Sequence, residues 1–363
     1  MDYRICFLLP VCQAGVCIAA MAYLSSDILY DILRRLDGPS LASAACTCSS
    51  LSSLSREETL WENVCKSMWP STDSRDATNL ILSIGGFRKF YADCFPLIVN
   101  NDYHGQTDGG HESFLPADLI SLVDIRFGDR IIWSKVLWGI PDVNGSNSWF
   151  HSCPFRIDLL RDEETEGGEA ITLSVSDGLQ PVSSLEKERK DGKLWRDLRD
   201  RLRLSWIIVN RKIKKAVNLS SWSSLGGHRH WPTEKDFVIR FGSVLPARPQ
   251  CRAVECVLTM KCRVVRTEED GYNQTRLGLT ELGMELEDME GSHVNGRNSM
   301  WILAEALRCR RSRNYSEALE LRHMFTRAQR ELREEKMRSD NVLDRIFILS
   351  AITAFLTFCY FVL

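Results

Sequence analysis

The chain has 363 residues, enough for two or three domains at about 150 residues each. Its 46 basic and 48 acidic side chains leave a net charge of −2, which argues against a protein that binds nucleic acid through its whole surface. A hydrophobic share of 44%, with 10 Trp and 15 Phe, supplies a sizeable core and excludes wholesale disorder.

Residues 1–23 form an apolar N-terminal extension in which Gln13 is the only strongly polar side chain after the first few residues. Ala20-Met21-Ala22 fits the small-x-small cleavage pattern of a signal peptide, but the residues at the very start carry no net positive charge. The alternative is that translation of the working protein starts at Met21. The extension alone supports both interpretations equally, so the next segment has to decide between them.

A short helix is predicted from residue 24 onward. Ser25 or Ser26 can cap it, and Asp27 suits its positive N-terminal end. Apolar side chains recur at helical spacing on one predicted face, at Ile28, Ile32, Leu33 and Leu36. The Asp-Gly-Pro run at 37–39 ends this helix, because glycine permits a left-handed turn and proline suits the first turn of the next helix.

Two more helices are predicted before residue 69. The second carries an apolar stripe made of Leu41, Ala44, Ala45, Cys48 and Leu51. The third follows a capping-box pattern, Ser55 with Glu58 three residues later, ahead of Leu60 and Trp61. Three helices in so short a segment bury little surface by themselves, so the unit needs a partner to cover its remaining apolar face.

The run L-x-x-D-I-L-x-x-I-L-x-x-L-D-x-x-x-L, closed by Leu60-Trp61, resembles an F-box and places that domain at 24–69. In F-box proteins the helices dock on a Skp-type adaptor and so join a cullin-based ubiquitin ligase. The resemblance implies core or adaptor-binding roles for Leu24, Ile28, Ile32, Leu33, Leu36, Leu41, Leu60 and Trp61. Ser25 departs from the proline common in the family, and Leu51 departs from its frequent tryptophan. The alternative is a generic helical hairpin packed on its own domain.

Further stretches are similar to a plant subgroup of F-box proteins with an uncharacterised C-terminal region and an apolar C-terminal tail. They read LDGPSLASAACTCSSL, REETLWENVCKSMWPST, SWIIVNRKIKKAVNLSSW and HRHWP. The likeness covers most of residues 24–363, and members of the subgroup begin only a few residues before the F-box. It therefore favours Met21 as the working start, because an F-box in the secretory lumen would meet no adaptor.

Residues 70–114 are interpreted as a helical connector and a loop. Aromatic and other apolar side chains share one predicted helical face within 79–99, namely Phe87, Phe90, Tyr91, Cys94 and Phe95. Residues 100–113 are polar and glycine-rich, which is typical of a loop at a domain boundary.

The pattern of residues 115–290 predicts a β-rich domain. We interpret this domain as the part that binds substrate. Residues 254–264 alternate strictly between inward and outward positions, as expected for an antiparallel strand with one wet face. Shorter strand patterns occur at 123–127, 130–138, 204–210, 237–241 and 276–287. Because turn-rich links join them without alternating helices, the sequence predicts a sandwich or an open barrel. The fold class is therefore α+β, with F-box helices followed by the β-rich domain.

Residues 299–345 predict a charged helical stalk, with helices at 301–307 and 315–338. Residues 346–363 contain no charge, proline or glycine and are apolar on every side, and as a helix they span about 27 Å, close to a bilayer core. Between 308 and 345 there are 11 Lys/Arg and 7 Asp/Glu, which favours retention on the cytosolic side. We expect a transmembrane tail anchor on the cytosolic face of an endomembrane. The alternative is an apolar helix docked on the protein's own core, in a cytoplasmic or nuclear protein.

No motif predicts catalysis, a cofactor or a metal. The chain lacks G-x-S-x-G, H-E-x-x-H and P-loop patterns. Its 13 cysteines lack zinc-ribbon spacing and favour reduced, mostly buried thiols. The basic run at 211–215 is too narrow for a nucleic-acid site. His228, His230 and Trp231 form a polar-aromatic cluster, interpreted as a recognition loop or, more simply, as a packed loop between two strands.

The leading hypothesis is a non-catalytic substrate-receptor subunit of an SCF-type cullin ubiquitin ligase. Its F-box binds the Skp-type adaptor and thereby a cullin, and its β-rich body binds an unknown substrate protein. Its contribution is proximity of the substrate to the ubiquitin-loaded enzyme. The alternative is a membrane-anchored scaffold that binds the adaptor without a ligase role, and co-purification of a cullin distinguishes the two.

Overall fold

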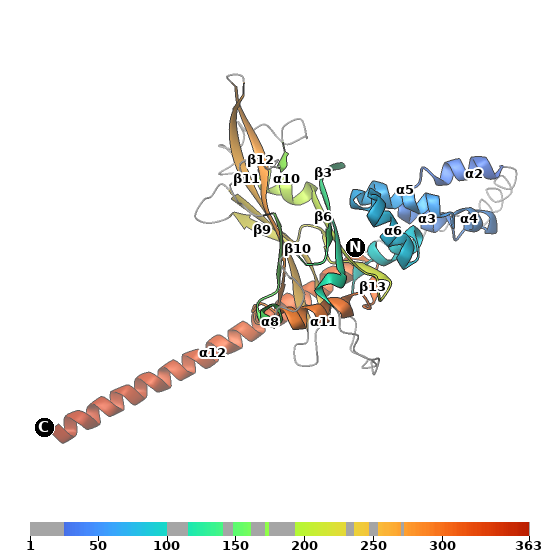
Figure 1. Ribbon diagram of the computed structural model, residues 1–363. Coiled ribbons are helices and arrows are strands. Elements are labelled where there is room, and N and C mark those ends of the chain that lie inside the picture. Colours follow the sequence, from blue (N-terminus) through green and yellow to red (C-terminus); the bar gives the residue numbers. More distant parts are fainter. Residues whose placement is uncertain are drawn as a thin grey trace, which may run out of the picture. The chain divides into compact units, whose positions relative to one another are not determined.

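The computed structural model describes residues 25–99, 115–140, 148–160, 171–173, 193–229, 236–246, 253–269 and 272–362. The chain divides into two compact units, one ending at Asp93 and the other beginning at Cys94. Helices fill the first unit, whereas β-sheets and a long C-terminal helix dominate the second (Figure 1). The α+β class is confirmed. The expected extension at 1–23 and the expected loop at 100–113 lie outside the described residues.

The first unit consists of short helices. They are α2 (Ser26–Leu33), α3 (Gly38–Ala44), α4 (Ser49–Leu54), α5 (Glu58–Met68), the 3-10 helix η1 (Pro70–Asp73), α6 (Arg75–Ile84) and α7 (Phe87–Cys94). Ser25 caps α2 by accepting a hydrogen bond from the Ile28 amide at 3.4 Å, and Asp37 caps α3 by accepting one from the Ser40 amide at 3.0 Å. Each cap satisfies a backbone donor that the helix itself leaves unpaired.

Two predicted helices are each divided in two. The helix expected over 41–51 ends as α3 and restarts as α4, because Thr47 donates both its amide and its hydroxyl to the Ala44 carbonyl and so replaces helical hydrogen bonding. The helix expected within 79–99 is divided into α6 and α7 at Gly85 and Gly86, whose φ angles of +123° and +88° end a helix at little steric expense.

The predicted capping box at Ser55 and Glu58 does not form. Ser55 instead ends α4, and its hydroxyl donates to the Ser52 carbonyl at 3.0 Å. The Glu58 carboxylate accepts a hydrogen bond from the Phe87 amide, so it caps α7, a helix distant in sequence. Glu58 therefore caps a helix, as the local pattern suggested, but the helix is α7 and not its own helix α5.

Aromatic side chains join α7 to the preceding helices. Trp61 donates its indole N–H to the Ser55 carbonyl at 2.7 Å, and its ring lies 5.1 Å from that of Tyr91. Trp69 meets Phe90 edge to face at 5.6 Å. The helices within the expected 70–114 connector are therefore an integral part of the first unit.

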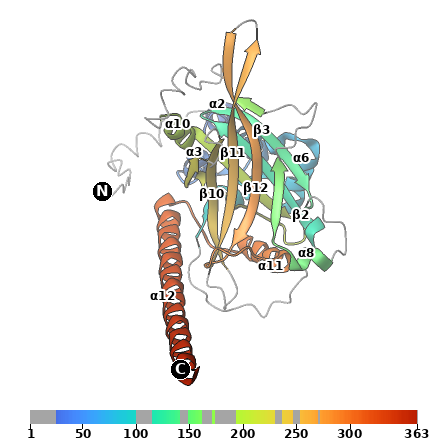
Figure 2. The same ribbon diagram turned by 90° about the vertical axis from the view of Figure 1, so that its left-hand side faces the viewer.

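The larger sheet of the second unit has six antiparallel strands in the order β4-β12-β11-β10-β9, with β5 also paired to β12. The strands are β4 (Arg156–Leu160), β5 (Ile171–Leu173), β9 (Gly226–Arg229), β10 (Asp236–Pro246), β11 (Ala253–Glu269) and β12 (Tyr272–Glu287). The β11–β12 hairpin extends beyond its neighbours (Figure 2). A register shift between Lys261 and Cys262 marks a bulge in this hairpin.

The smaller sheet has the order β3-β2-β6-β7, with β8 also paired to β6. Its strands are β2 (Leu119–Phe127), β3 (Arg130–Trp138), β6 (Leu202–Asn210), β7 (Lys215–Asn218) and β8 (Trp222–Ser223). One hydrophobic cluster takes side chains from both sheets, including Ile125 and Trp206 from this sheet and Phe241 and Met260 from the larger one. The two sheets are therefore layers around a common core.

The strand predicted at 254–264 has the expected inward side, since Cys256, Leu258 and Met260 are buried in the core. The side expected to be wet is partly covered, because Glu255 and Val257 are also buried. Part of this cover is the C-terminal helix α12 (Tyr315–Val362), whose Arg322 forms an ion pair with Glu255 at 3.0 Å. The sequence pattern could not anticipate a helix arriving from so far along the chain.

The remaining described elements complete the body. They are the 3-10 helix η2 (Pro116–Asp118), helices α8 (Ser148–Ser152), α10 (Lys193–Arg201) and α11 (Gly296–Ala306), and the small β1 (Leu97–Ile98) and β13 (Arg311–Ser312) pair. Ile302 and Leu303 of α11 lie in the core. The start of the expected 299–345 stalk is thus a core helix, and the exposed stalk begins only within α12.

The C-terminal helix is continuous, so the expected stalk and the expected apolar tail share one helix (Figure 1). Its early turns pack on the body, with Phe325 5% exposed, whereas residues 330–345 are all exposed. Within the described ranges it is the one helix long and apolar enough to cross a membrane, and its apolar window is not buried.

Candidate adaptor-binding site

The outer side of α2 carries apolar side chains in the open. Ile28 and Ile32 are 49% and 45% exposed, and they lie one helical turn apart. Leu36 follows in the turn after the helix and is half-buried, with its amide donating to the Leu33 carbonyl at 3.1 Å. We call Ile28, Ile32 and Leu36 the exposed α2 face. Such a grouping of large aliphatic side chains suits burial against another protein.

The inner side of α2 consists of Leu29 and Leu33, which are 6% and 1% exposed. Helical spacing groups Leu33 with Ile28 and Ile32, but in the structure Leu33 turns inward. It does so together with Leu29, which the predicted face did not include. Both sides of the helix show apolar residues four apart, so spacing alone could not tell which side turns inward. The Tyr30 hydroxyl and the Thr59 Oγ1, 2.8 Å apart, link α2 to α5 and set its orientation.

The other expected adaptor-binding residues belong to the core of the first unit. Leu41, Leu60 and Trp61 are at most 4% exposed, and Trp61 packs on Tyr91. Side chains this buried stabilise the first unit by packing and offer a partner little surface. Leu24 lies outside the described residues.

Charges flank the exposed α2 face without interrupting it. Asp31 forms ion pairs with Arg34 at 3.2 Å and Arg35 at 2.8 Å, and all three side chains are largely exposed. Exposed pairs of this kind contribute at most about 1 kcal/mol to stability. The site therefore offers apolar contact area with a charged border, which is the chemistry of protein binding.

The expected recognition loop is described only in part. His228 is exposed on β9, which ends the larger sheet, and it lies opposite Val238 of β10. His230 and Trp231 lie outside the described residues. The proposed cluster of the three side chains stays a prediction.

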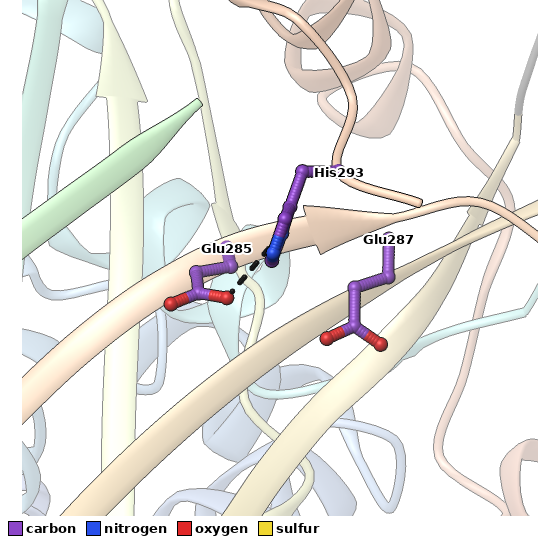
Figure 3. Close-up of side chains that lie close together, drawn as sticks. All are labelled: Glu285, Glu287 and His293. Carbon is purple, nitrogen blue, oxygen red and sulfur yellow. Dashed lines mark ion pairs between the residues drawn. The ribbon is translucent and has the colours of Figure 1, made fainter. Parts of the chain in front are cut away.

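One group with metal-ligand chemistry occurs in the described part of the chain: Glu285, Glu287 and His293, whose ligand atoms lie within 4.8 Å of one another (Figure 3). His293 lies 3.5 Å from the Glu285 carboxylate. Arg156 also reaches Glu285 at 3.1 Å, and Arg240 reaches Glu287 at 3.7 Å. Burial raises the pKa of Glu287, against the opposing effect of Arg240. Because arginines already neutralise both carboxylates, we interpret this group as an ion-pair network.

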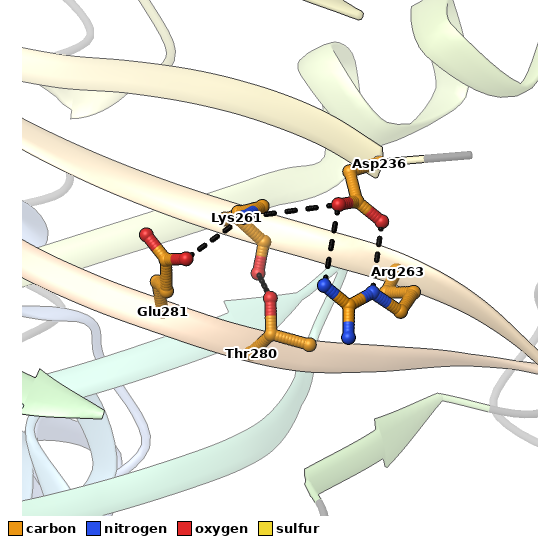
Figure 4. Close-up of polar contacts among 5 residues, drawn as sticks. All are labelled: Asp236, Lys261, Arg263, Thr280 and Glu281. Carbon is orange, nitrogen blue, oxygen red and sulfur yellow. Dashed lines mark hydrogen bonds and ion pairs between the residues drawn. The ribbon is translucent and has the colours of Figure 1, made fainter. Parts of the chain in front are cut away.

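A second charged group ties three strands of the larger sheet together (Figure 4). Asp236 of β10 is 1% exposed and accepts a hydrogen bond from Arg263 Nε at 3.0 Å. Lys261 of β11 lies 3.7 Å from Asp236 and 2.8 Å from Glu281 of β12. A buried carboxylate needs such partners, so the network specifies the pairing of the strands.

The fold and the site together define an α+β protein in which a helical module with an exposed apolar face precedes a β-rich body. The F-box-like family profile matches residues 26–67, within the expected 24–69. In Arabidopsis thaliana, F-box protein At2g27310 is 31% identical over 95% of this chain and 96% of its own length. Probable F-box protein At2g36090 is 30% identical over 92% and 90%, and F-box protein At3g44326 is 33% identical over 79% and 74%.

The chain belongs to the F-box protein family. The resemblance stated from its sequence motifs is confirmed, both for the N-terminal domain and for the plant relatives that match most of the chain. No solved structure matches the chain.

Proposed function

We propose that this protein is a non-catalytic substrate-receptor subunit of an SCF-type cullin ubiquitin ligase. The observation that supports the proposal most is the exposed α2 face, because it lies inside the segment that matches the F-box-like profile. Burial of each isoleucine against a Skp-type adaptor would contribute about 1 kcal/mol, because about half of each residue is already covered. The β-rich body within 115–290 would then hold the substrate, and the chain itself would catalyse no step.

The adaptor test uses the double variant Ile32→Asp, Leu36→Asp in the full chain. We expect binding to a purified Skp-type adaptor to weaken by at least about 100-fold, because two carboxylates would have to be desolvated in an apolar interface. Binding is measured by pull-down and titration, and circular dichroism checks that the helices remain.

The control is Leu82→Asp, which introduces one carboxylate, against two in the double variant, at a leucine of α6 that is 52% exposed in the same unit. This control should bind the adaptor as the wild type does. A double variant that binds as well as the wild type would remove the basis for assigning adaptor binding to α2.

Adaptor binding does not separate a ligase subunit from a scaffold, so a second measurement is needed. We expect a cullin to co-purify with the full chain through the adaptor, and the lifetime of at least one cellular protein to lengthen when the chain is deleted. Adaptor recovered without cullin, and with no protein stabilised, would instead support the scaffold.

We also propose that the apolar end of α12 anchors the protein in a membrane. Residues 346–362 are helical and exposed apart from Cys359, which is half-buried, so they do not dock on the body. Ile352→Lys with Leu356→Lys would place two charges in the span at about 2.5–3.5 kcal/mol each. We expect this variant, like deletion of 346–363, to move from the carbonate-resistant pellet to the soluble fraction.

The matched control is Ile352→Leu with Leu356→Ile, which keeps the hydrophobicity of the helix and should remain in the pellet. An intact chain that is already soluble after cell fractionation would contradict the anchor.

A further inference from the structure

The first turns of α12 are clamped onto the body. Arg322 Nη1 lies 3.0 Å from Glu255 Oε1, and the two side chains are only 22% and 11% exposed. One turn further on, Phe325 is 5% exposed. Burial lowers the pKa of Arg322 against the opposing effect of Glu255, so removing either partner would leave an uncompensated buried charge and should weaken the seating of these turns.

A small pocket lies beneath these turns. A cavity of about 30 Å³ remains between α12 and β10, lined by Leu319 and Arg322 from the helix and by Ser221, Gly242 and Ser243 from the body, among others. It has room for about two water molecules. The packing between the helix and the sheet is therefore close but not complete.

Beyond the clamp, α12 contains no residue that would introduce a hinge. The segment from 315 to 363 has neither proline nor glycine, and the helix is unbroken to Val362. Lys336 reaches Glu290 of the body at 3.6 Å, and Arg338 pairs with Glu334 one turn earlier at the same distance. The side chains of residues 330–345 are exposed to solvent, and after Lys336 the nine residues 337–345 span about 14 Å, at 1.5 Å per residue, before the apolar segment begins.

We propose that α12 is a rigid spacer that holds the β-rich body at a fixed height and rotation above the membrane. A flexible tether of the nine residues 337–345 would let the body move over roughly 15–18 Å in every direction, including down to the lipid surface. A helix packed on the body instead holds the nearest edge of the body about 14 Å from the lipid. The substrate class that fits is a membrane-embedded protein whose cytosolic segment reaches that height. The inference rests on the proposed receptor function and anchor.

The test measures the distance between the body and the membrane in the full chain. The chain carries a fluorescent amino acid in place of exposed His228 and is reconstituted into phosphatidylcholine vesicles that contain an acceptor-labelled lipid. Time-resolved energy transfer gives the distance distribution. Duplicating residues 333–339 adds two helical turns in nearly the same phase, and we expect it to raise the mean distance by about 10 Å.

Two matched pairs of variants test rigidity. Replacing 339–342 with four glycines should broaden the distribution and lower its mean, whereas four alanines at the same positions should leave both unchanged. Arg322→Ala should broaden the distribution by releasing the clamp, whereas Arg327→Ala, an exposed arginine of the same helix, should not.

Equal distributions for the glycine and alanine variants, or no shift on duplication, in chains that do insert would overturn the spacer and leave the anchor intact. A wild-type chain that fails to enter the vesicles would overturn the anchor, and the spacer with it. In cells, ubiquitin-remnant peptides that depend on the chain should come from cytosolic segments of membrane proteins and should decline in the glycine variant. A remnant set from soluble proteins would overturn the substrate class.

Discussion

At the scale of single residues, the sequence pattern singled out Gly38 but gave the wrong reason for a glycine at that position. The sequence pattern assigned it a left-handed turn, but the residue is the first of α3 and is not among the positive-φ glycines. The reason for glycine is the Tyr91 ring, which occupies the space that a Cβ atom would need. The constraint is a close approach between segments more than fifty residues apart, and no local pattern could reveal it.

We expect Gly38→Ala to destabilise the first unit by about 1–3 kcal/mol, because the new methyl group would displace the Tyr91 ring from its packing against Trp61 and Trp69. Helix propensity alone would predict the opposite sign, a gain of up to about 1 kcal/mol. Urea unfolding measures the difference. Ser40→Ala, at an exposed position of the same helix, is the control and should change stability little. A stabilised Gly38→Ala chain would show that the ring moves aside without loss.

At the scale of elements, α7 depends on a capping group that its own sequence does not supply. Its first amide, at Phe87, donates to Glu58 of α5, and the preceding Gly86 has a φ of +88°, which favours glycine, with the Glu58 carboxylate beside it. The acidic residue also suits the positive end of the α7 helix dipole. One side chain thus fixes where α7 begins and how it meets α5.

Glu58→Ala should therefore destabilise the first unit by about 0.5–2 kcal/mol, the usual effect of losing a helix cap. The control is Glu57→Ala, which removes an adjacent carboxylate that makes no side-chain capping bond. Thermal unfolding of both variants gives the comparison. Equal decreases in the unfolding temperature of the two variants would mean that only the loss of a negative charge matters and that the Glu58 cap does not stabilise α7.

The elements themselves were largely predictable. The strands at 123–127, 130–138, 204–210, 237–241 and 254–264 all form, although 123–127 and 204–210 are buried on both sides of their sheet. The predicted helices were too long in two places. One is broken at Gly85 and Gly86, and the other is broken where Thr47 competes for backbone hydrogen bonds. The exposed α2 face was identified as a set of residues, but only the packing of Leu29 and Leu33 decided which members remain on the surface.

At the scale of the whole molecule, the continuity of α12 changes the meaning of its parts. A charged helical stalk over 299–345 and an apolar tail were expected in succession. The structure places the start of that stalk in the core as α11 and joins the rest to the tail as one helix whose base packs on the sheet. This continuity fixes the orientation of the apolar end relative to the β-rich body, which the proposed spacer requires. The same 48 residues broken by one flexible link would connect the two without orienting either.

The sequence by itself determined the family, the α+β class, the apolar character of the C-terminal helix and most strands, since each of these follows from local spacing, composition or motif. Only the tertiary structure decided which side of α2 is exposed, what Gly38 and Glu58 contact, and where α12 leaves the body. Those features depend on contacts between segments that are distant in the sequence. A periodic pattern shows that a helix or strand has an apolar face, but it does not show which segment packs against that face.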